Sequence, residues 1–365
     1  MNICSVGTAF PGRYHDQDEL LAELKRVWGH RFYNSARLEH IHRAVSVGGR
    51  HLALPVEEYE GLSSFSDSNR AYIRVATDLG AAAVSAALEE ASLDVADVDH
   101  LMFASITGLA TPSIDARLVN RLGLREDVKR TPIFGLGCLA GSAGVARAAD
   151  YVRAYPEQTA VVLSVELCSL TLQRTDTSMA NIIASGLFGD GAAAVVVRGS
   201  RAPEPHTDAS DLNDSGAGPS KGPEVVATRS VFYRDTEDVM GWEFGGDGFR
   251  LVLSGEIPDL TRRHLRRDVD DFLAEQSLSL PEIQSYVCHP GGPKVLRAIE
   301  EVLDLHDGEL DLTWQSLRDV GNLSSASVLV VLRETIHRRR PTAGSYGLMM
   351  SMGPGFCAEL VLLRW

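Results

Sequence analysis

The chain has 365 residues, of which 44% are hydrophobic and 23% are charged, and its formal net charge is −14 at pH 7. This length predicts two domains or one large double domain, because a single hydrophobic core rarely grows to that size. The acidic balance argues against nucleic acid or an anionic membrane surface as a partner. Five cysteines without CxxC spacing argue against a disulfide framework and against a zinc site.

The start of the chain carries no targeting pattern. Residues 1–6 lack a basic segment followed by an apolar one, and no uninterrupted apolar run reaches about 18 residues. We therefore expect a cytoplasmic protein with reduced cysteines and no association with a membrane.

In chain order, segments with the pattern of strands alternate with segments that have the pattern of helices. Such alternation is typical of an α/β fold. The expected strands before residue 200 are 2–7, 100–106, 129–134, 160–165 and 192–198, and the expected helices are 16–28, 71–92, 113–122 and 141–155.

A change of composition divides the chain. Residues 199–223 consist mostly of Ser, Pro, Gly, Asp and Asn, which is typical of a flexible surface loop or linker. We therefore predict an N-terminal half at 1–199, a linking loop at 200–224 and a C-terminal half at 225–365. Two such α/β halves suggest a duplicated architecture with the site between them. In the C-terminal half, strands are expected at 225–233, 285–288 and 357–365, and helices at 258–276, 294–303 and 327–336.

Cys138 lies where a predicted strand meets an Ala-rich predicted helix. The unpaired N–H groups and the dipole at a helix N-terminus lower the pKa of a thiol toward neutrality. Small residues on both sides of Cys138 would let a substrate carbonyl approach closely. A cysteine in this place is either a nucleophile or a buried core residue, and its position alone does not decide between them.

His289 and Asn322 occupy two later turns of the same kind, each flanked by Gly or Pro and each followed by a predicted helix. A rigid scaffold presents functional side chains at such positions. Cysteine, histidine and a third polar residue suit acyl transfer, because the imidazole activates the thiol and N–H donors stabilise an oxyanion. Papain-type proteases use this trio in the same order, but the local sequence signature around their cysteine is absent here.

Five motifs in this order and with this spacing resemble those of the type III polyketide synthases, relatives of chalcone synthase in the thiolase-like superfamily. The resemblance covers nearly the whole chain. It implies a thiolase-like fold, with duplicated α/β halves in a layered α-β-α-β-α arrangement. The motifs are Gly137-Cys138-Leu139-Ala140-Gly141, Gly186-Leu187-Phe188-Gly189-Asp190-Gly191, His289-Pro290-Gly291-Gly292-Pro293, Gly321-Asn322-Leu323-Ser324-Ser325 and Gly353-Pro354-Gly355-Phe356.

The resemblance also implies a reaction. Cys138 would take a starter acyl group from a CoA thioester, and His289 would hold its sulfur as a thiolate. His289 and Asn322 would then stabilise the enolate that forms when malonyl-CoA loses carbon dioxide, and a Claisen condensation would extend the chain before it cyclises. CoA thioesters are the only substrates implied, with no metal and no bound cofactor. The alternative is an enzyme like β-ketoacyl-ACP synthase III, which uses an acyl-carrier protein.

Further site residues follow from the resemblance. Leu172, Leu251 and Met352 fall where chalcone synthases have phenylalanine, which favours an aliphatic acyl-CoA starter and an alkylpyrone or resorcinol/resorcylic-type product; as an alternative, the three are plain core residues. Phe188 and Gly353 are expected to line the same substrate pocket.

For CoA, Arg37, His40 and Arg43 recur every three residues and would share a helix face, unless they form only a solvated basic surface. Lys294, at the start of the helix after His289, is a second candidate for a CoA contact. The resemblance implies a homodimer, in which Thr111 lines the pocket of the neighbouring subunit.

Overall fold

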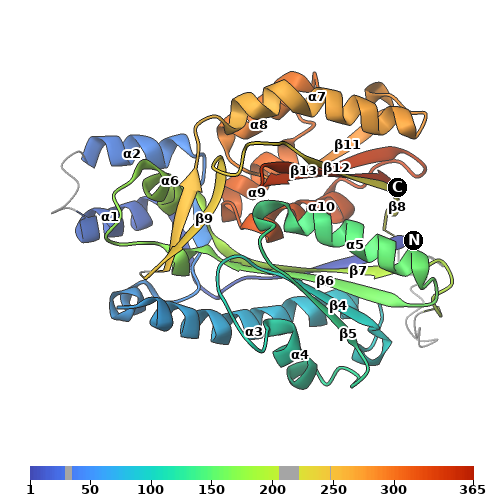
Figure 1. The fold of residues 1–365 in the computed structure, drawn as a ribbon, viewed down its shortest axis with the longest axis horizontal. Coiled ribbons are helices and arrows are strands. Elements are labelled where there is room, and N and C mark those ends of the chain that lie inside the picture. Colours follow the sequence, from blue (N-terminus) through green and yellow to red (C-terminus); the bar gives the residue numbers. More distant parts are fainter. Residues whose placement is uncertain (29–34, 205–221, 247) are drawn as a thin grey trace.

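The computed structural model describes residues 1–28, 35–204, 222–246 and 248–365. Within this part of the chain, nine strands hydrogen-bond in the order β11-β12-β13-β8-β1-β7-β6-β4-β5. One residue pair, Asn2 with Glu224, joins β1 to β8 among the described residues. The ribbon separates at this joint into two stacked sheets, with helices between them and on both outer faces (Figure 1). The protein therefore has the layered thiolase-like arrangement.

The first sheet consists of β5, β4, β6, β7 and β1, and the second of β11, β12, β13 and β8. Strands β6 and β7 are buried along almost their whole length and read as continuous apolar runs, as expected for strands that are covered on both faces. The strand bounds are Asn2–Ala9 (β1), His100–Ala104 (β4), Lys129–Ile133 (β5), Thr159–Leu167 (β6), Asp190–Arg198 (β7), Glu224–Phe232 (β8), Ile283–Cys288 (β11), Tyr346–Gly353 (β12) and Cys357–Arg364 (β13).

The two sheets repeat one pattern. In the first sheet β4 pairs with β6 in parallel, β6 with β7 antiparallel, and β7 with β1 antiparallel. The second sheet has the same order of pairings along β11, β12, β13 and β8. Helix α5 (Ala140–Ala154) leads into β6 as α10 (Ser327–Arg338) leads into β12, and these two helices form the central layer (Figure 1). The N-termini of α5 and α10 thus occupy equivalent places in the two halves.

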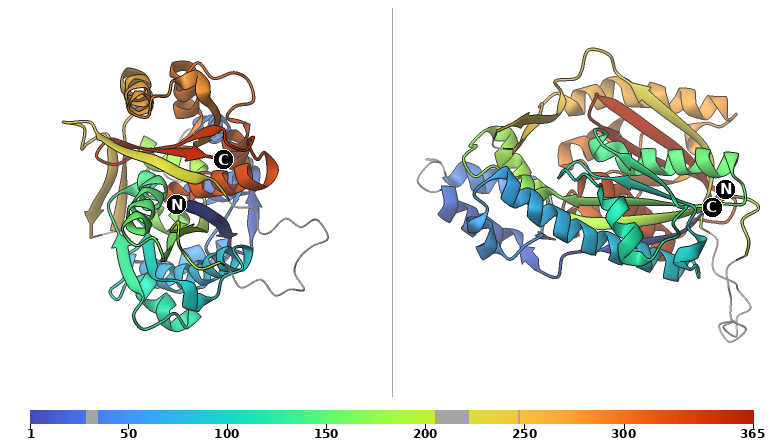
Figure 2. Two further views of the ribbon diagram at one scale, coloured as in Figure 1. Left: turned by 90° about the vertical axis from the view of Figure 1, so that its right-hand side faces the viewer. Right: turned by 60° about the horizontal axis from the view of Figure 1, so that its bottom comes forward.

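The outer layers consist of helices that follow the strands. Helices α3 (Phe65–Glu90) and α4 (Ile114–Leu122) cover the first sheet, and α7 (Ile257–Glu275) and α8 (Pro293–Val302) cover the second (Figure 2). Helix α4 ends at Gly123, whose φ of 71° is left-handed and suits glycine.

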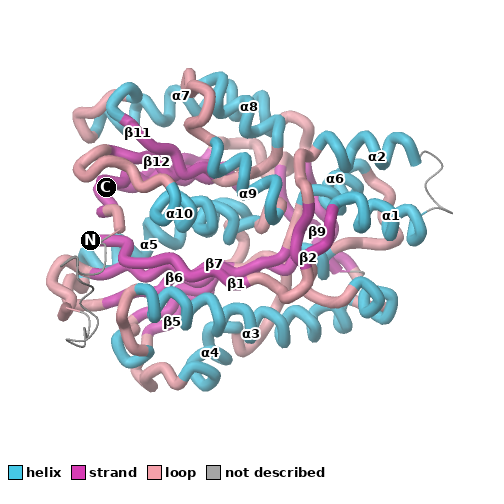
Figure 3. Tube along the Cα trace, turned by 180° about the vertical axis from the view of Figure 1, so that it is seen from behind, coloured by secondary structure: helices cyan, strands magenta, loops and turns pink. Residues whose placement is uncertain are grey.

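A smaller group of elements gathers at one end, and both chain termini lie at the opposite end (Figures 1 and 3). Three helices of this group share a small core that contains Trp28, Leu38 and Ile182. The bounds are Tyr14–Asp16 (β2), Gln17–Trp28 (α1), Ser35–Ala44 (α2), Gly49–His51 (β3), Met179–Leu187 (α6), Met240–Gly245 (β9) and Gly248–Leu253 (β10). Helix α9 spans Asp311–Val320.

Among the described residues, one helix is long and apolar enough to cross a membrane, and this helix is α3. Half of its most apolar window is buried in the structure. Tyr72, Val84 and Leu88 of α3 pack in the core beneath the first sheet. Core packing therefore accounts for the apolar character of α3.

Every strand and helix predicted from the sequence is present, with ends that differ by a few residues. Helix α3 begins six residues earlier than predicted, at Phe65, because Ser64 caps it by accepting a hydrogen bond from the Asp67 N–H. Strands β2, β3, β9, β10 and β12 and helices α6 and α9 were not predicted. Most of the predicted loop at 200–224 lies outside the described residues, so the proposed division of the chain stays a prediction.

Candidate functional site

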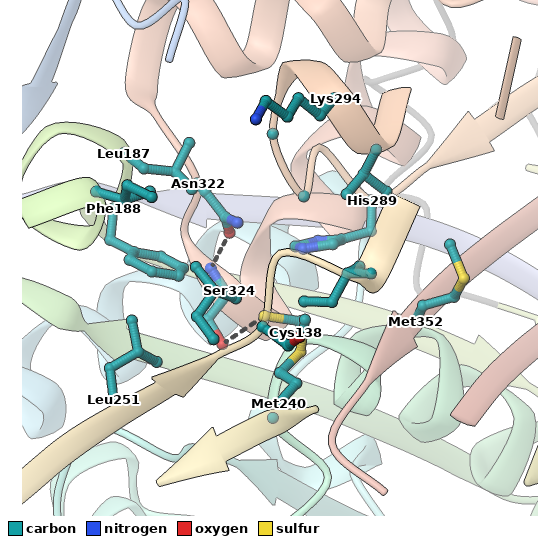
Figure 4. A pocket seen from close by; sticks show the side chains of 18 of the residues that line it. Cys138, Leu187, Phe188, Met240, Leu251, His289, Lys294, Asn322, Ser324 and Met352 are labelled. Carbon is teal, nitrogen blue, oxygen red and sulfur yellow. Dashed lines mark hydrogen bonds between the residues drawn. The ribbon is translucent and has the colours of Figure 1, made fainter. Parts of the chain in front are cut away.

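A cavity of about 630 Å³ lies where the N-termini of α5 and α10 approach the end of β11. Cys138, His289 and Asn322 all line it, although Cys138 and Asn322 are 184 positions apart along the chain. Figure 4 shows their side chains around one common space. The three residues predicted from turn positions are therefore brought together.

Cys138 sits in a short 3₁₀ turn, Gly137–Leu139, that leads directly into α5. Its side chain is half-buried because the sulfur faces the cavity, and Sγ donates a hydrogen bond to Ser324 Oγ at 3.6 Å. Ser324 begins a 3₁₀ turn, Ser324–Ala326, that leads directly into α10. The sulfur therefore lies between the positive ends of two helix dipoles.

His289 follows β11 without an intervening residue. Its backbone N–H donates to Met350 O at 2.9 Å, which continues the parallel pairing of β11 with β12 and fixes the position of the ring. The residue is 6% exposed, and Nδ1 has no hydrogen-bond partner within the described part of the chain. Because Nδ1 is enclosed by protein, proton exchange with a substrate in the cavity falls to the other ring nitrogen, Nε2.

Asn322 is held on both sides by backbone hydrogen bonds from a distant segment. Its N–H donates to Leu187 O at 2.9 Å, and its carbonyl accepts from the Gly189 N–H at 3.0 Å. The side-chain Oδ1 accepts from the Ser324 N–H at 2.8 Å (Figure 4), which leaves Nδ2 as the donor of this side chain. Asn322 is 1% exposed, so the donor is kept away from bulk water.

Gly321 makes this close approach possible. Its φ of +73° is left-handed, and a Cβ at this position would lie 2.9 Å from Leu187 O. The Gly-Asn pair in the motif therefore has a physical reason: the glycine lets the Asn322 backbone reach the end of α6.

Burial acts against both charged forms of the Cys138–His289 pair. It raises the pKa of the Cys138 thiol to about 12, with a smaller contribution in the same direction from Glu166 and an opposing one from the Ser324 hydrogen bond. It lowers the pKa of His289 to about 3. The raised pKa of Cys138 is opposite to the lowered thiol pKa expected from the sequence, because desolvation outweighs the effect of the helix N-terminus. The lowered pKa of His289 likewise disfavours the imidazolium that would accompany a thiolate.

Glu166 is a buried carboxylate near the cavity that the sequence analysis missed. It is on β6 and accepts hydrogen bonds from the Ile106 N–H at 3.1 Å, from Thr107 Oγ1 at 3.0 Å and from Ser325 Oγ. Burial raises its pKa. The only sequence signal was a single acidic residue inside the apolar strand at 159–167, which is a place where charge is rare.

Three of the predicted pocket residues line the cavity, namely Phe188, Leu251 and Met352. Leu172 does not; it lines a second cavity of about 150 Å³. The second cavity shares Phe188, Leu251, Trp242 and Cys168 with the first. Leu172 ends a 3₁₀ turn that points its side chain toward α1 and α2, where it packs against the small core.

Gly353 is not among the residues that line the cavity, although its neighbours Met352 and Pro354 are, and its place in a substrate pocket stays a prediction. A Cβ on Gly353 would lie 2.9 Å from both Leu136 O and Leu139 N. The residue instead lets the end of β12 pack against the turn that carries Cys138. Its effect on the site is through the position of that turn.

The predicted CoA contacts are only partly brought together. Arg37, His40 and Lys294 line the cavity and are exposed, as expected at an entrance, whereas Arg43 is exposed but does not line it. Positions three apart drift by about 60° around a helix of 3.6 residues per turn, so the two steps from Arg37 to Arg43 add up to about 120° and leave the face on which they began. Arg43 therefore does not share the place of Arg37 and His40 at the cavity.

Thr111 is exposed before α4 and does not line this cavity. Its predicted role concerns a second subunit and stays a prediction. Among the described residues, no group of three or more His, Cys, Asp or Glu side chains is arranged to hold a metal ion.

Comparisons with known proteins agree with this geometry. Residues 2–201 match the family of chalcone and stilbene synthases, N-terminal domain, and residues 224–365 match the C-terminal domain of the same family. The chain is 50% identical to a 1,3,6,8-tetrahydroxynaphthalene synthase of Streptomyces peucetius subsp. caesius, over 100% of this chain and 93% of the relative. It is 36% identical to a putative chalcone synthase of Bacillus subtilis, over 100% of this chain and 98% of the relative.

A solved structure is also similar over the whole chain. It is the 1,3,6,8-tetrahydroxynaphthalene synthase of Streptomyces coelicolor A3(2), a bacterial type III polyketide synthase, with a TM-score of 0.90 and 29% identity. The similarity covers 100% of this chain and 99% of that one.

Proposed function

Since the chain belongs to the chalcone and stilbene synthase family, and so to the type III polyketide synthases, we propose that it condenses malonyl-CoA by decarboxylation through Cys138, His289 and Asn322. The enzyme is an acyltransferase of the condensing type. The observation that carries the proposal is that the three side chains line one cavity with a mostly apolar wall. An apolar wall lowers the local dielectric constant, which strengthens hydrogen bonds to a developing charge.

The first proposed step loads Cys138. Sγ attacks the carbonyl carbon of a CoA thioester, the bond from that carbon to the CoA sulfur breaks, and CoA leaves with the proton of the thiol. Because burial disfavours both the thiolate and the imidazolium, the proton passes to His289 as the new bond forms. The N-terminus of α5 stabilises negative charge on the sulfur during this transfer.

The second step breaks the bond between the malonyl methylene and its carboxylate. Carbon dioxide leaves, and the electron pair forms an enolate on the thioester oxygen. His289 and Nδ2 of Asn322 donate to this oxygen, and one such donor in a dry site contributes about 3 kcal/mol. The enolate carbon then attacks the acyl carbonyl on Cys138, the carbon–sulfur bond breaks, and the lengthened chain returns to Cys138 for the next round.

Exposed cations lie where the CoA moiety would enter. We propose that Arg37, His40 and Lys294 contact its phosphates or pantetheine arm, because all three line the cavity and are exposed. Lys294 is in the first turn of α8, where the positive end of the helix dipole adds to its charge.

For the starter, we propose malonyl-CoA itself and a product of the 1,3,6,8-tetrahydroxynaphthalene type. The support is the 50% identity, over the whole chain, to a synthase of that product. The ten-carbon naphthalene forms from five malonyl units with release of five carbon dioxide, five CoA and one water.

A second candidate is an aliphatic acyl-CoA starter that leads to an alkylpyrone or a resorcinol/resorcylic-type product. The observation that favours it is the wall of the cavity, where Leu251 and Met352 offer flexible aliphatic surface. The adjoining cavity of about 150 Å³ beyond Phe188 adds apolar space of about the size that holds one benzene-sized group.

Mass spectrometry of the products distinguishes the two. The purified protein is supplied with malonyl-CoA alone, and with malonyl-CoA plus acyl-CoAs of increasing length, without carrier protein. The tetrahydroxynaphthalene mass from malonyl-CoA alone supports the first candidate, and masses that rise with the starter support the second. A requirement for acyl-carrier protein would contradict both.

A further inference from the structure

Arg50 is a buried cation that the proposed chemistry does not use. It belongs to β3, is 3% exposed, and forms no ion pair with the described residues. Burial lowers its pKa to about 10, with Asp190 as the main opposing charge, so it remains a cation at neutral pH. A guanidinium in this environment needs hydrogen-bond acceptors on most of its donors.

The acceptors of Arg50 are the carbonyl groups at the C-terminal end of α6. A helix leaves its last four carbonyls without partners inside the helix, and these carry the negative end of the dipole. In α6 all four carbonyls accept a hydrogen bond. Arg50 donates to two of them, from Nη2 to Ser185 O and from Nη1 to Gly186 O at 2.7 Å, and Gln17 Nε2 also donates to Gly186 O at 2.9 Å. The other two accept from backbone N–H groups, Ala184 O from Phe188 and Leu187 O from Asn322.

Gln17 extends this arrangement to α1. Its Oε1 accepts from Arg50 Nη1 at 2.6 Å, and its Nε2 also donates to His42 O at 3.2 Å. Gln17 of α1 thus fixes the guanidinium of Arg50 in place. The planar guanidinium in turn holds the C-terminal end of α6 through its two donors.

The last carbonyl of α6 leads to the site. Leu187 O and the Gly189 N–H are the two groups that hold the backbone of Asn322, one on each side of Phe188. A movement of residues 185–187 is therefore passed to the backbone of Asn322, whereas the backbone of Cys138 is held by other elements, the turn before α5 and the end of β12. The thiol is linked to Asn322 only through Ser324 among the described residues.

We propose that Arg50 is a positioning residue for Asn322: by holding the C-terminal end of α6, it sets where the Asn322 amide meets the thioester oxygen of malonyl-CoA. The inference rests on the proposed role of Asn322 in decarboxylation. A donor that is misplaced by about 1 Å costs about 100-fold in rate. The loss should therefore fall on decarboxylation and leave the chemistry of the Cys138 thiol intact.

The test separates two readouts. Decarboxylation is followed as acetyl-CoA formed from malonyl-CoA by Cys138→Ala protein, in which the enolate takes a proton because no acyl group is available. Reactivity of the thiol is followed as the rate of Cys138 alkylation by iodoacetamide in protein that keeps the cysteine. Both are measured for Arg50→Met, Arg50→Lys and Gln17→Met, with Arg229→Met as the control that removes a cation paired elsewhere, with Glu275.

We expect decarboxylation to fall about 100-fold in Arg50→Met and about 10-fold in Arg50→Lys and Gln17→Met, with alkylation within twofold of the parent and no change in Arg229→Met. Unchanged decarboxylation in all three variants, or equal losses of both readouts, would overturn the inference. If Arg50→Met does not unfold cooperatively in urea, the other two variants decide. If the Cys138→Ala parent forms no acetyl-CoA, the proposed function and this inference fail together.

Discussion

Replacing Gly321 by alanine tests whether the approach of Asn322 to the end of α6 is what builds the donor site. The backbone at Gly321 has φ of +73° and ψ of −169°, a region that is essentially restricted to glycine. A Cβ there would lie 2.9 Å from Leu187 O, which is the acceptor of the Asn322 N–H. Alanine therefore strains the backbone and also displaces the group that positions Asn322.

The two effects are of known size. Backbone strain in this region costs about 1–3 kcal/mol. Weakening one buried hydrogen bond costs about 1 kcal/mol more. We therefore expect Gly321→Ala to lower the free energy of unfolding by about 2–4 kcal/mol and to reduce decarboxylation about 100-fold, since the amide shifts by a large part of an ångström.

Gly344 provides a matched control. Its φ is +84°, but no atom lies within 4 Å of a Cβ added there, so Gly344→Ala carries the strain without the contact. Urea unfolding and the malonyl-CoA decarboxylation assay are run on both variants. Equal losses of stability together with unchanged decarboxylation in Gly321→Ala would refute the reasoning.

Three other predictions follow from the same geometry. Burial lowers the pKa of His42 to about 4, below its unfolded value of about 6.5. The contribution of neutral His42 to the free energy of unfolding is therefore complete above pH 6.5 and is lost as the pH falls toward 4. Urea unfolding should give a free energy about 2 kcal/mol lower at pH 5 than at pH 7, and His42→Asn should reduce that difference. Lys294→Glu should raise the KM for malonyl-CoA about 10-fold, while Arg43→Glu, which removes a cation outside the cavity, should leave it unchanged. Leu251→Phe narrows the opening between the two cavities, so products should shift to shorter chains if acyl starters are used; an unchanged product profile would show that Leu251 does not select chain length.

Much of the site could be predicted from local sequence. Cys138, His289 and Asn322 each stand at a turn that precedes a helix, and for Cys138 and His289 the strand before the turn is also visible within a few residues. Buried strands elsewhere in the first sheet, such as residues 159–167, are continuous apolar runs and are equally easy to recognise. The local sequence pattern does not show which distant residues contact these elements in the folded protein.

The features that the sequence analysis missed or placed differently depend on such partners. Arg50 looks like an ordinary surface cation in the sequence, because the carbonyls that bury it belong to a helix more than 130 residues away. Leu172 matched a pocket position in the chain order, but only the turn at residues 168–171 decides that its side chain faces the second cavity. Strand β12 was missed because a Met-rich run fits a helix as well as a strand, and its pairing with β11 and β13 decides between them.

The ionisation of the pair is another property that the sequence could not supply. A helix N-terminus favours a thiolate, and this was the whole of the local information. The depth at which Cys138 and His289 are buried comes from the packing of both halves around the cavity, and it opposes both charges. The balance of the two effects is a tertiary property.

The most direct test of the central claim is to measure loading and decarboxylation separately in Cys138→Ala and Asn322→Ala protein, by intact-protein mass spectrometry and by release of labelled carbon dioxide from malonyl-CoA. If the three side chains act in one cavity as proposed, Cys138→Ala protein carries no acyl group but still releases carbon dioxide. Asn322→Ala protein is acylated but releases carbon dioxide about 100-fold more slowly. Acylation that persists without Cys138, or decarboxylation that is unchanged without Asn322, would contradict the account.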